Sequence, residues 1–512
     1  MDVQSTSVRE DQANRATALL VDWSPDGPGP AHHRLAAALR AEIGSGRLRP
    51  GERLPPTRAL AEELGVSRWV VTECYDQLKA EGHLTGLVGS GTRVSERSTA
   101  TDLPGEPSGK AAGASTTTGV TSATGVTSAT GAGVSRTAAE RLPASLDLSP
   151  ALPDLASFPR PAWRAAVTRA LSTATDHALG YPDPSGAPEL RSTMAGYMRR
   201  VRGLDVDPAT VHITQGVRNA VSLLCRQLRA AGATRVAVED PSWPRMREVA
   251  RAGGLDVVAV PVDSLGMQVD TLVELDRRSR IDAVFVTPTH QFPTGVPLSA
   301  QRRRALVGWA AAGGRLVVED DYDAEFRYDR RPVGALAALD PDHVAYVGSV
   351  SKTLSPALHL GWMVVPRSRA ESVAAQREAV GALAPTLDQL ALAHLIESGA
   401  YDRHLRRMRR SYRQRRAALL AALDRYAGGA PAPSMDAGLH VLWQLPDGCS
   451  EPQVLAGCRS AGLAVLGLSQ CRVAPGPAGL VLGSGNVAEH RAAEVARIVG
   501  GAISSSAGQG GR

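Results

Sequence analysis

The stretch GERLPPTRALAEELGVSR, residues 51–68, decides the fold of the N-terminal part of the chain. It predicts a helix from Thr57 to Leu64, a turn at Gly65 and a second helix that begins at Ser67, which is the spacing of a helix-turn-helix. Apolar side chains recur at 70, 74 and 78, so one face of the second helix should be buried. An apolar repeat at 35, 39 and 43 predicts an earlier helix, and GSGTRV (89–94) predicts a hairpin wing. Together these signals predict an α+β winged helix-turn-helix over residues 31–95.

The exposed face of the second helix carries the candidate DNA-binding side chains. Residues at the N-terminal end of a recognition helix reach base edges, and glycines in a wing let the backbone approach the duplex closely. Trp69 is unusual there, and it either packs on a sugar or a thymine methyl or folds back onto the domain. The residues expected at double-stranded DNA are Arg58, Ser67, Arg68, Trp69, Thr72, Gly91 and Thr92. The segment resembles the winged helix of the GntR family.

Charge alone does not establish a nucleic-acid partner. The net charge is +6 and the pI is near 9.2, but residues 31–95 hold nine Lys/Arg against seven Asp/Glu. The densest basic run is HLRRMRRSYRQRR (404–416), far from the helix-turn-helix. It is either the solvated face of an amphipathic helix, which we favour, or a second contact with the DNA backbone.

The length and composition predict a multidomain chain. At 512 residues it is too long for one ordinary core, and residues 96–145 are so rich in Ala, Gly, Ser and Thr that they predict a flexible linker. No apolar run is long enough to span a membrane, and no signal peptide opens the chain. The five cysteines form no CxxC or Cys/His ligand pattern, so we expect reduced thiols, no metal site and a cytoplasmic protein.

After the linker, short apolar runs alternate with helical stretches over residues 146–502. The runs are RVAVED (235–240), DVVAVPV (256–262), DAVFVTP (282–288), GRLVVED (314–320) and HVAYVGS (343–349). Strands buried on both faces that alternate with helices indicate a mainly parallel α/β sheet. Ligands then bind at the carboxyl ends of the strands, where several distinctive residues lie.

Four of those residues match the needs of pyridoxal 5′-phosphate (PLP). The cofactor requires a lysine for its aldehyde, a carboxylate for its pyridine nitrogen, a donor for its 3-oxygen and a ring to stack on. Lys352 in GSVSKTLSP is the expected Schiff-base lysine, and Asp320 would hold the pyridinium nitrogen. Tyr322 would donate to the 3-oxygen, and Trp243 would stack on the ring. The expected phosphate cup joins Ser349 to the helix start at Gly216, Val217 and Arg218, where free N–H groups suit a dianion.

This half is similar to aminotransferases of fold type I, and the whole chain resembles regulators of the MocR/GabR type. TPTHQFPTG (287–295), EDDYDAEFRYD (319–329), YPDPSGAPELR (181–191) and AGLHVLW (437–443) carry the resemblance. It implies a head-to-tail homodimer in which Tyr181 approaches the phosphate of the partner's site.

The chain departs from these relatives at two positions. His359 stands where they usually have an arginine that grips the PLP phosphate, and Arg218 is the expected compensation. Gln470 stands where the GabR-like pattern has an arginine for an amino-acid carboxylate. Arg472 or Arg245 would then hold the anionic group of an effector, or no carboxylate is bound in the usual way and the effector is PLP or another amine.

Three hypotheses follow. The leading one is a PLP-dependent transcriptional regulator that senses PLP, an amino acid or an amine. The second is an active aminotransferase with an accessory winged helix, against which Gln470 argues. The third is a scaffold for dimerisation that binds no PLP.

Overall fold

The computed structural model describes residues 30–44, 48–80, 83–87, 91–95, 146–328, 334–381 and 383–507. The predicted linker, 96–145, lies outside the described residues, as do residues 88–90 of the expected wing. Within the described ranges no helix is both long and apolar enough to cross a bilayer.

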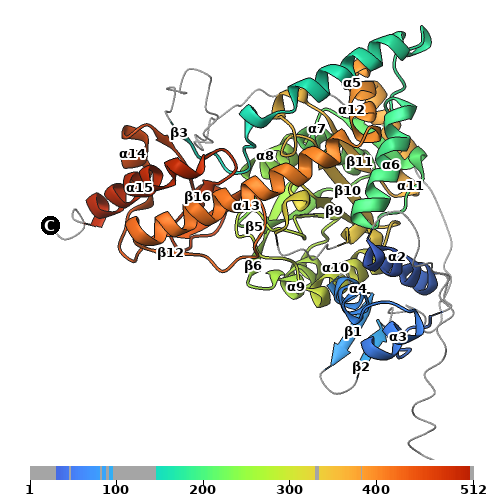
Figure 1. Ribbon diagram of the computed structural model, residues 1–512, viewed down its shortest axis with the longest axis horizontal. Helices are drawn as coiled ribbons and strands as arrows, with labels where there is room; N and C mark the ends of the chain where they lie inside the picture. The colour runs from blue at the N-terminus through green and yellow to red at the C-terminus, as the bar shows by residue number, and fades with distance from the viewer. Residues whose placement is uncertain are drawn as a thin grey trace, which may run out of the picture.

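The N-terminal unit has the predicted helix-turn-helix and two strands of a wing. It consists of α2 (Ala31–Gly44), α3 (Thr57–Glu63), α4 (Arg68–Ala80), β1 (Leu84–Leu87) and β2 (Gly91–Val94). Gly65 joins α3 to α4 with a φ of +64°, a left-handed conformation that favours glycine. β1 and β2 are antiparallel, and the predicted apolar face of α4 is buried at Val71, Cys74 and Leu78. In Figure 1 this unit lies in blue below α6 and α10.

The central sheet of the larger part has eight strands among the described residues, in the order β4-β11-β10-β9-β8-β5-β6-β7. The strands are β4 (Val211–Thr214), β5 (Arg235–Asp240), β6 (Asp256–Asp263), β7 (Gly266–Met267), β8 (Ala283–Val286), β9 (Leu316–Asp320), β10 (Val344–Ser349) and β11 (Gly361–Val364). The pairs β10–β9, β9–β8, β8–β5 and β5–β6 are parallel, whereas β11 is antiparallel to both its neighbours. The mainly parallel sheet is therefore as predicted.

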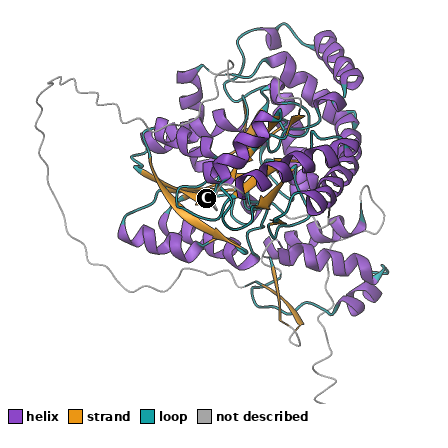
Figure 2. Ribbon diagram, turned by 90° about the vertical axis from the view of Figure 1, so that its left-hand side faces the viewer, coloured by secondary structure: helices purple, strands orange, loops and turns teal. Residues whose placement is uncertain are grey.

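Helices cover both faces of this sheet (Figure 2). Successive residues of one strand point to opposite faces, so Val236 and Val238 pack with α7 and α8 while Ala237 faces the other layer. The expected burial on both faces is wrong for β6, most of which is half-buried or exposed because only the short β7 lies beyond it. The helices are α5 (Arg160–Thr173), α6 (Pro188–Arg202), α7 (Val217–Ala230), α8 (Pro244–Ala252), α9 (Val269–Arg278), α10 (Ala300–Gly313), α11 (Arg367–Val380) and α12 (Thr386–Glu397).

The long helix α13 (Ala400–Tyr426) connects this layer to a smaller C-terminal one (Figure 1). The smaller layer contains a sheet of β12 (Ala430–Pro431), β13 (His440–Gln444), β16 (Gly479–Gly483) and β15 (Leu466–Gly467), with α14 (Glu451–Ser460) and α15 (Ala492–Ala507). β3 (Leu146–Asp147) pairs with β14 (Leu463–Ala464), so the chain enters the large part beside its C-terminal layer. α13 buries Tyr401, Leu405 and Met408 and exposes arginines, which is the amphipathic pattern favoured for residues 404–416.

A buried ion pair lies next to the place where the N-terminal unit meets the large one. Arg202, the last residue of α6, places Nε 2.7 Å from Oδ2 of Asp321, and both side chains are almost wholly buried. The next residue, Gly203, has a φ of +63° and lies against Arg40 of α2, because a Cβ atom there would come 3.2 Å from Arg40 Cζ. The C-terminal end of α6 is therefore also in contact with the N-terminal unit.

Candidate functional site

The candidate site lies at the carboxyl ends of the central strands. Asp320 is the last residue of β9, Ser349 is the last residue of β10, and Gly216 and Trp243 follow β4 and β5 within three residues. Parallel neighbours end at the same edge of a sheet, so the register brings together side chains that are far apart in sequence.

Asp320 is prepared for a cationic partner. It is 6% exposed, and its Oδ1 atom has no hydrogen-bond partner. Burial, followed by the charge of Asp321, raises the pKa of Asp320 to about 7, and the nearby Lys352 ammonium partly opposes that rise. A buried carboxylate oxygen without a donor is costly unless a ligand supplies one. The protonated nitrogen of a pyridine ring is such a donor.

Lys352 follows β10 in a turn that two side chains of α13 fix through the neighbouring Thr353. The hydroxyl of Tyr401 donates to Oγ1 of Thr353 at 2.8 Å, and His404 Nε2 lies 2.8 Å from the Thr353 carbonyl oxygen. Burial lowers the pKa of Lys352, while Asp320 and Asp323 act in the opposite direction. A lowered pKa favours the neutral amine, which is the nucleophilic form that an aldehyde requires.

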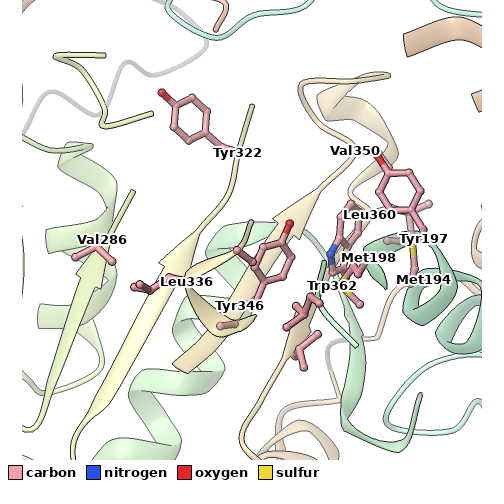
Figure 3. Packing of buried hydrophobic residues seen from close by; sticks show 14 of the residues in the cluster. Met194, Tyr197, Met198, Val286, Tyr322, Leu336, Tyr346, Val350, Leu360 and Trp362 are labelled. Carbon is pink, nitrogen blue, oxygen red and sulfur yellow. The ribbon is translucent and has the colours of Figure 1, made fainter. Parts of the chain in front are cut away.

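Tyr322 lies beyond the end of β9. It is separated from the buried aromatic residues Tyr346 and Trp362 (Figure 3). Its hydroxyl oxygen is 3.0 Å from Nδ1 of His290, which is in turn 2.9 Å from Oδ2 of Asp323. Burial, then the charges of Asp323 and Asp320, raises the pKa of Tyr322 well above its ordinary value. Tyr322 therefore stays protonated and keeps a hydrogen to donate.

The expected phosphate cup is open above Gly216. This residue precedes α7 with a φ of +89°, and a Cβ built on it would meet no atom within 4 Å. Val217 begins the helix, and Ser349 is buried at the end of β10. Arg218 and His359 both line an open pocket of about 760 Å³ beside α7 and α8, and Gly216, Ser349 and Lys352 are not among its lining residues.

The two arginines expected to hold an effector have different surroundings. Arg245 forms an ion pair with Glu248 of its own helix at 2.7 Å. The guanidinium of Arg472 packs where a Cβ of Gly476 would be, and its buried Nε has no hydrogen-bond partner. Trp243 is half-buried at the start of α8 and packs against both core layers.

The loop that contains Gln470 is fastened to the large part of the molecule. Arg247 donates to the carbonyl oxygens of Gln470 at 3.2 Å and Cys471 at 2.8 Å. Asp240 accepts from the backbone N–H groups of Val473 and Ala474 at 2.8 and 2.9 Å. The position at which relatives carry a carboxylate-binding arginine is thus held by backbone contacts.

The candidate DNA-binding residues form the exposed side of α3 and α4. Arg58, Ser67, Arg68 and Thr72 are exposed, and Arg58 makes an exposed ion pair with Glu62 at 3.3 Å. Trp69 is 59% exposed and meets His32 edge-on at 5.2 Å between ring centroids. Gly91 and Thr92 lie on β2 of the wing. Tyr181 is wholly exposed on this chain.

Sequence reasoning missed three buried residues beside Tyr322. His290, Asp323 and His440 bring one ligand atom each to within 4.8 Å of the others. All three lie in the stretches that carry the family resemblance, TPTHQFPTG, EDDYDAEFRYD and AGLHVLW. Those stretches were the available signal, because nothing in the local pattern predicts that they converge.

Comparison with known proteins agrees with this architecture. Residues 31–94 match the gntR family of bacterial regulatory proteins, and residues 149–481 match aminotransferase class I and II. The chain is 34% identical to the HTH-type pyridoxine biosynthesis transcriptional regulator PdxR of Corynebacterium glutamicum, over 88% of this chain and 91% of that protein. It is 32% identical to the probable rhizopine catabolism regulatory protein MocR of Rhizobium meliloti, over 81% and 82%.

Solved structures show the same fold in the larger part. LysN, the α-aminoadipate aminotransferase of Thermus thermophilus, aligns with a TM-score of 0.65 at 26% identity, over 71% of this chain and 93% of that one. The predicted winged helix, the aminotransferase fold of type I and the resemblance are thereby confirmed. The chain belongs to the MocR-type family of transcriptional regulators, in which a GntR-type DNA-binding domain is joined to an aminotransferase-like domain.

Proposed function

We propose that this regulator binds PLP through Lys352 and that the bound cofactor controls how the winged helices engage DNA. The observation that carries the proposal is the unpartnered Oδ1 of Asp320, buried at the end of β9 near Lys352. The fold supports it, since LysN was solved with N-(5′-phosphopyridoxyl)-L-leucine.

Each residue of the site would contact a different part of the cofactor. Asp320 would hold the pyridine nitrogen, Tyr322 the 3-oxygen and Trp243 the ring face, while Lys352 would bind the aldehyde carbon. The phosphate would accept hydrogen bonds from the N–H groups at Gly216 and Val217, the hydroxyl of Ser349 and the side chains of Arg218 and His359. When bound, PLP acts as an electron sink for amines that reach it.

The effector that the site supports best is PLP itself. Gln470 offers no charge to a carboxylate, and the backbone beside it is fastened by Arg247. Arg245 pairs with Glu248 of its own helix, whereas the buried Nε of Arg472 has no partner and would still suit an anionic group. The name of the PdxR relative, a regulator of pyridoxine biosynthesis, agrees with this choice. An amino acid or another amine is the second candidate. The side chains of Arg245 and its partner Glu248 are both partly exposed, so a ligand can reach Arg245.

The DNA-binding form is proposed to be a head-to-tail homodimer in the cytoplasm. The dimer supplies two winged helices for paired half-sites, with Arg58, Ser67, Arg68, Trp69 and Thr72 at the bases or backbone and Gly91 and Thr92 at the wing. It also gives Tyr181, exposed on the single chain, a place at the partner's phosphate cup. The domain boundaries proposed are 31–95, 96–145 and 146–502.

The test uses the scarcity of lysine in this chain. Lys79, Lys110 and Lys352 are its three lysines, so borohydride reduction of the PLP-loaded protein and peptide mapping identify the attachment point without ambiguity. We expect a visible band near 420 nm, its loss in Lys352→Ala and its retention in the matched control Lys79→Ala.

DNA binding then separates the regulator from the alternatives. We expect PLP to change the affinity of the wild-type protein for DNA selected from random duplexes, and to have no such effect on Lys352→Ala. A PLP band with steady transamination and no effect on DNA binding would favour an aminotransferase with an accessory winged helix. No band at saturating PLP would support the scaffold without cofactor.

A further inference from the structure

The hydroxyl of Tyr322 has a buried partner that the cofactor chemistry does not require. Nδ1 of His290 lies 3.0 Å from the Tyr322 oxygen and 2.9 Å from Oδ2 of Asp323. The side chains of His290 and Asp323 are 3% and 2% exposed. The three residues come from the loop after β8 and the loop after β9, and they meet because those strands are parallel neighbours.

We propose that His290 and Asp323 are positioning residues that keep the hydrogen of Tyr322 available for the 3-oxygen of PLP. This inference rests on the proposed function, because it concerns the same cofactor. A neutral imidazole nitrogen either donates or accepts, so Nδ1 cannot serve both neighbours at once. The Asp323 carboxylate favours the tautomer in which Nδ1–H donates to it, as carboxylates do for metal-bound and catalytic histidines. Tyr322 then finds no acceptor at Nδ1. Its hydroxyl also hydrogen-bonds Asp323, but Oδ2 of that carboxylate already accepts from Nδ1–H, so the Tyr322 hydrogen can turn to the 3-oxygen when PLP is bound.

Glycines hold His290 in this position. A Cβ at Gly438 would overlap the His290 ring and lie 2.6 Å from Oδ2 of Asp323. Gly438 is itself fixed, since its N–H donates to Phe326 O and its carbonyl accepts from the Tyr328 hydroxyl, both at 2.8 Å. A Cβ at Gly295 would come within 3.1 Å of His290 Nε2. The ring is therefore enclosed from two segments, and a larger residue at either glycine would displace it.

Titratable groups on several elements lie near Tyr322 and affect its pKa. The titratable groups are Asp320 and Asp323 after β9, Glu239 on β5, Lys352 after β10, His290 after β8 and His440 on β13. Burial keeps the His440 pKa well below its ordinary value, and its Nε2 lies 3.1 Å from the Pro293 carbonyl oxygen. Burial and the negative neighbours keep Tyr322 protonated, and Asp323 is the acceptor for which Tyr322 and His290 compete.

A metal ion is the other occupant that this cluster suggests. His290, Asp323 and His440 are residue types that bind zinc, and their ligand atoms lie within 4.8 Å of one another. The hydrogen bond between His290 and Asp323 already uses two of the three, which favours the proton arrangement over the metal. Metal content is therefore one outcome of the test.

The readout is the pH midpoint of the visible band of the PLP-loaded protein. The hydroxyl of Tyr322 stabilises negative charge on the 3-oxygen most when the nitrogen that joins Lys352 to PLP is unprotonated, because a protonated nitrogen already donates to that oxygen. Loss of the Tyr322 donor therefore raises the midpoint, by about one pH unit for a hydrogen bond worth about 1 kcal/mol. Tyr322→Phe sets the full size of the effect.

Two matched variants of His290 test the inference, because each places an amide nitrogen near one of the two ring-nitrogen positions. In His290→Asn the amide nitrogen takes the place of Nδ1 and can still donate to Asp323, so the midpoint should stay near that of the wild type. In His290→Gln the amide lies near the place of Nε2, Asp323 accepts from Tyr322 instead, and the midpoint should rise toward that of Tyr322→Phe. The double variant of His290→Gln with Tyr322→Phe should rise no further than Tyr322→Phe alone.

The control is a second histidine with the same geometry outside the pocket. His343 Nδ1 lies 2.9 Å from Oδ2 of Asp340, and His343→Gln should leave the midpoint unchanged. A midpoint that rises in Tyr322→Phe but not in His290→Gln, or equally in the Asn and Gln variants, overturns this inference and leaves PLP binding intact. About one zinc ion per purified chain, lost in Asp323→Asn, also overturns it. A wild-type protein with no band overturns the proposed function as well.

Discussion

Arg247 of α8 donates to the carbonyl oxygen of Cys471 at 2.8 Å and so joins the large part of the molecule to the loop before β16. The same guanidinium donates to Gln470 O and to Ser242 Oγ, at 3.2 Å each. Asp240 adds two contacts with the backbone of the same loop. These contacts fasten the loop that contains Gln470 to the large part of the molecule.

Removal of this contact should loosen the loop. Arg247→Ala removes the Arg247 donor from Gln470 O and leaves Cys471 O with the N–H of Ser242 alone, and we expect a loss of about 2 kcal/mol in the free energy of unfolding. Hydrogen exchange should rise over residues 468–476. The exposed Arg251 lies one turn further along α8, and Arg251→Ala should change neither quantity. Unchanged exchange in Arg247→Ala would mean that Asp240 and the Ser242 N–H are enough to fix the loop.

The buried ion pair of Arg202 and Asp321 should matter far more than an exposed one. Loss of one partner leaves a buried charge uncompensated, so Arg202→Met should cost about 3–5 kcal/mol. Arg200 pairs with Asp402 at 3.1 Å on the surface, and Arg200→Met should cost less than about 1 kcal/mol. Urea unfolding of the two variants measures the difference. Similar losses would contradict the burial argument.

The pKa of Asp320 predicts a pH-dependent contribution to stability in the cofactor-free protein. Its folded pKa of about 7 is above the ordinary 3.8, so the folded chain binds the extra proton between these values. The contribution of Asp320 is therefore fully present below about pH 4 and is lost as the pH rises through 7. The difference in stability between wild type and Asp320→Asn should fall across this window and then level off. Thermal melts at half-unit pH steps measure it, and a flat difference would show that the carboxyl is not perturbed.

Arg218 should contribute more to PLP affinity than His359. A guanidinium supplies a permanent charge, so Arg218→Ala should weaken binding about tenfold or more, while His359→Ala should weaken it less. His359 has a φ of +47°, a conformation that alanine resists, and His359→Asn is the control that separates backbone strain from the lost imidazole. Titration of the visible band gives the dissociation constants. Equal or reversed losses would refute the compensation.

Specific DNA binding should depend on the start of α4. Arg68→Ala removes a side chain that we propose contacts a base edge, and we expect a loss of about 1–3 kcal/mol in affinity for the selected duplex. Lys79 lies at the far end of the same helix beside Asp76, and Lys79→Ala should have little effect. Fluorescence anisotropy at fixed salt compares the two variants. A loss that is equal on unrelated DNA would assign Arg68 to the phosphate backbone.

The sequence was sufficient to predict many of the strands and helices and the places of several candidate site residues on them. Strands such as β9 and β10 were predicted from their apolar runs, and Asp320 and Ser349 lie at their ends as expected. The weak point was β6, because an apolar run does not reveal that the strand lies near the edge of the sheet. Trp69 was left open, and the structure shows it mostly exposed with one edge on His32.

Contacts that depend on register between distant segments were not predictable. His290 and Asp323 are 33 residues apart and meet through the pairing of β8 with β9. Arg247 and Cys471 are 224 residues apart, and local periodicity carries no information about that distance. The family stretches marked these positions as unusual, but they did not say which atoms meet.

In the proposed dimer, Tyr181 would make PLP binding depend on the concentration of the protein. This tyrosine lies fully in solvent on the single chain, although its proposed work is done in the partner's phosphate cup. A lone subunit would then hold a cup without its last hydroxyl and keep PLP poorly. At low copy number most subunits would lack PLP. At higher copy number dimerisation would complete the phosphate cups and PLP would bind. The concentration of the regulator would thus set the vitamin level to which it answers.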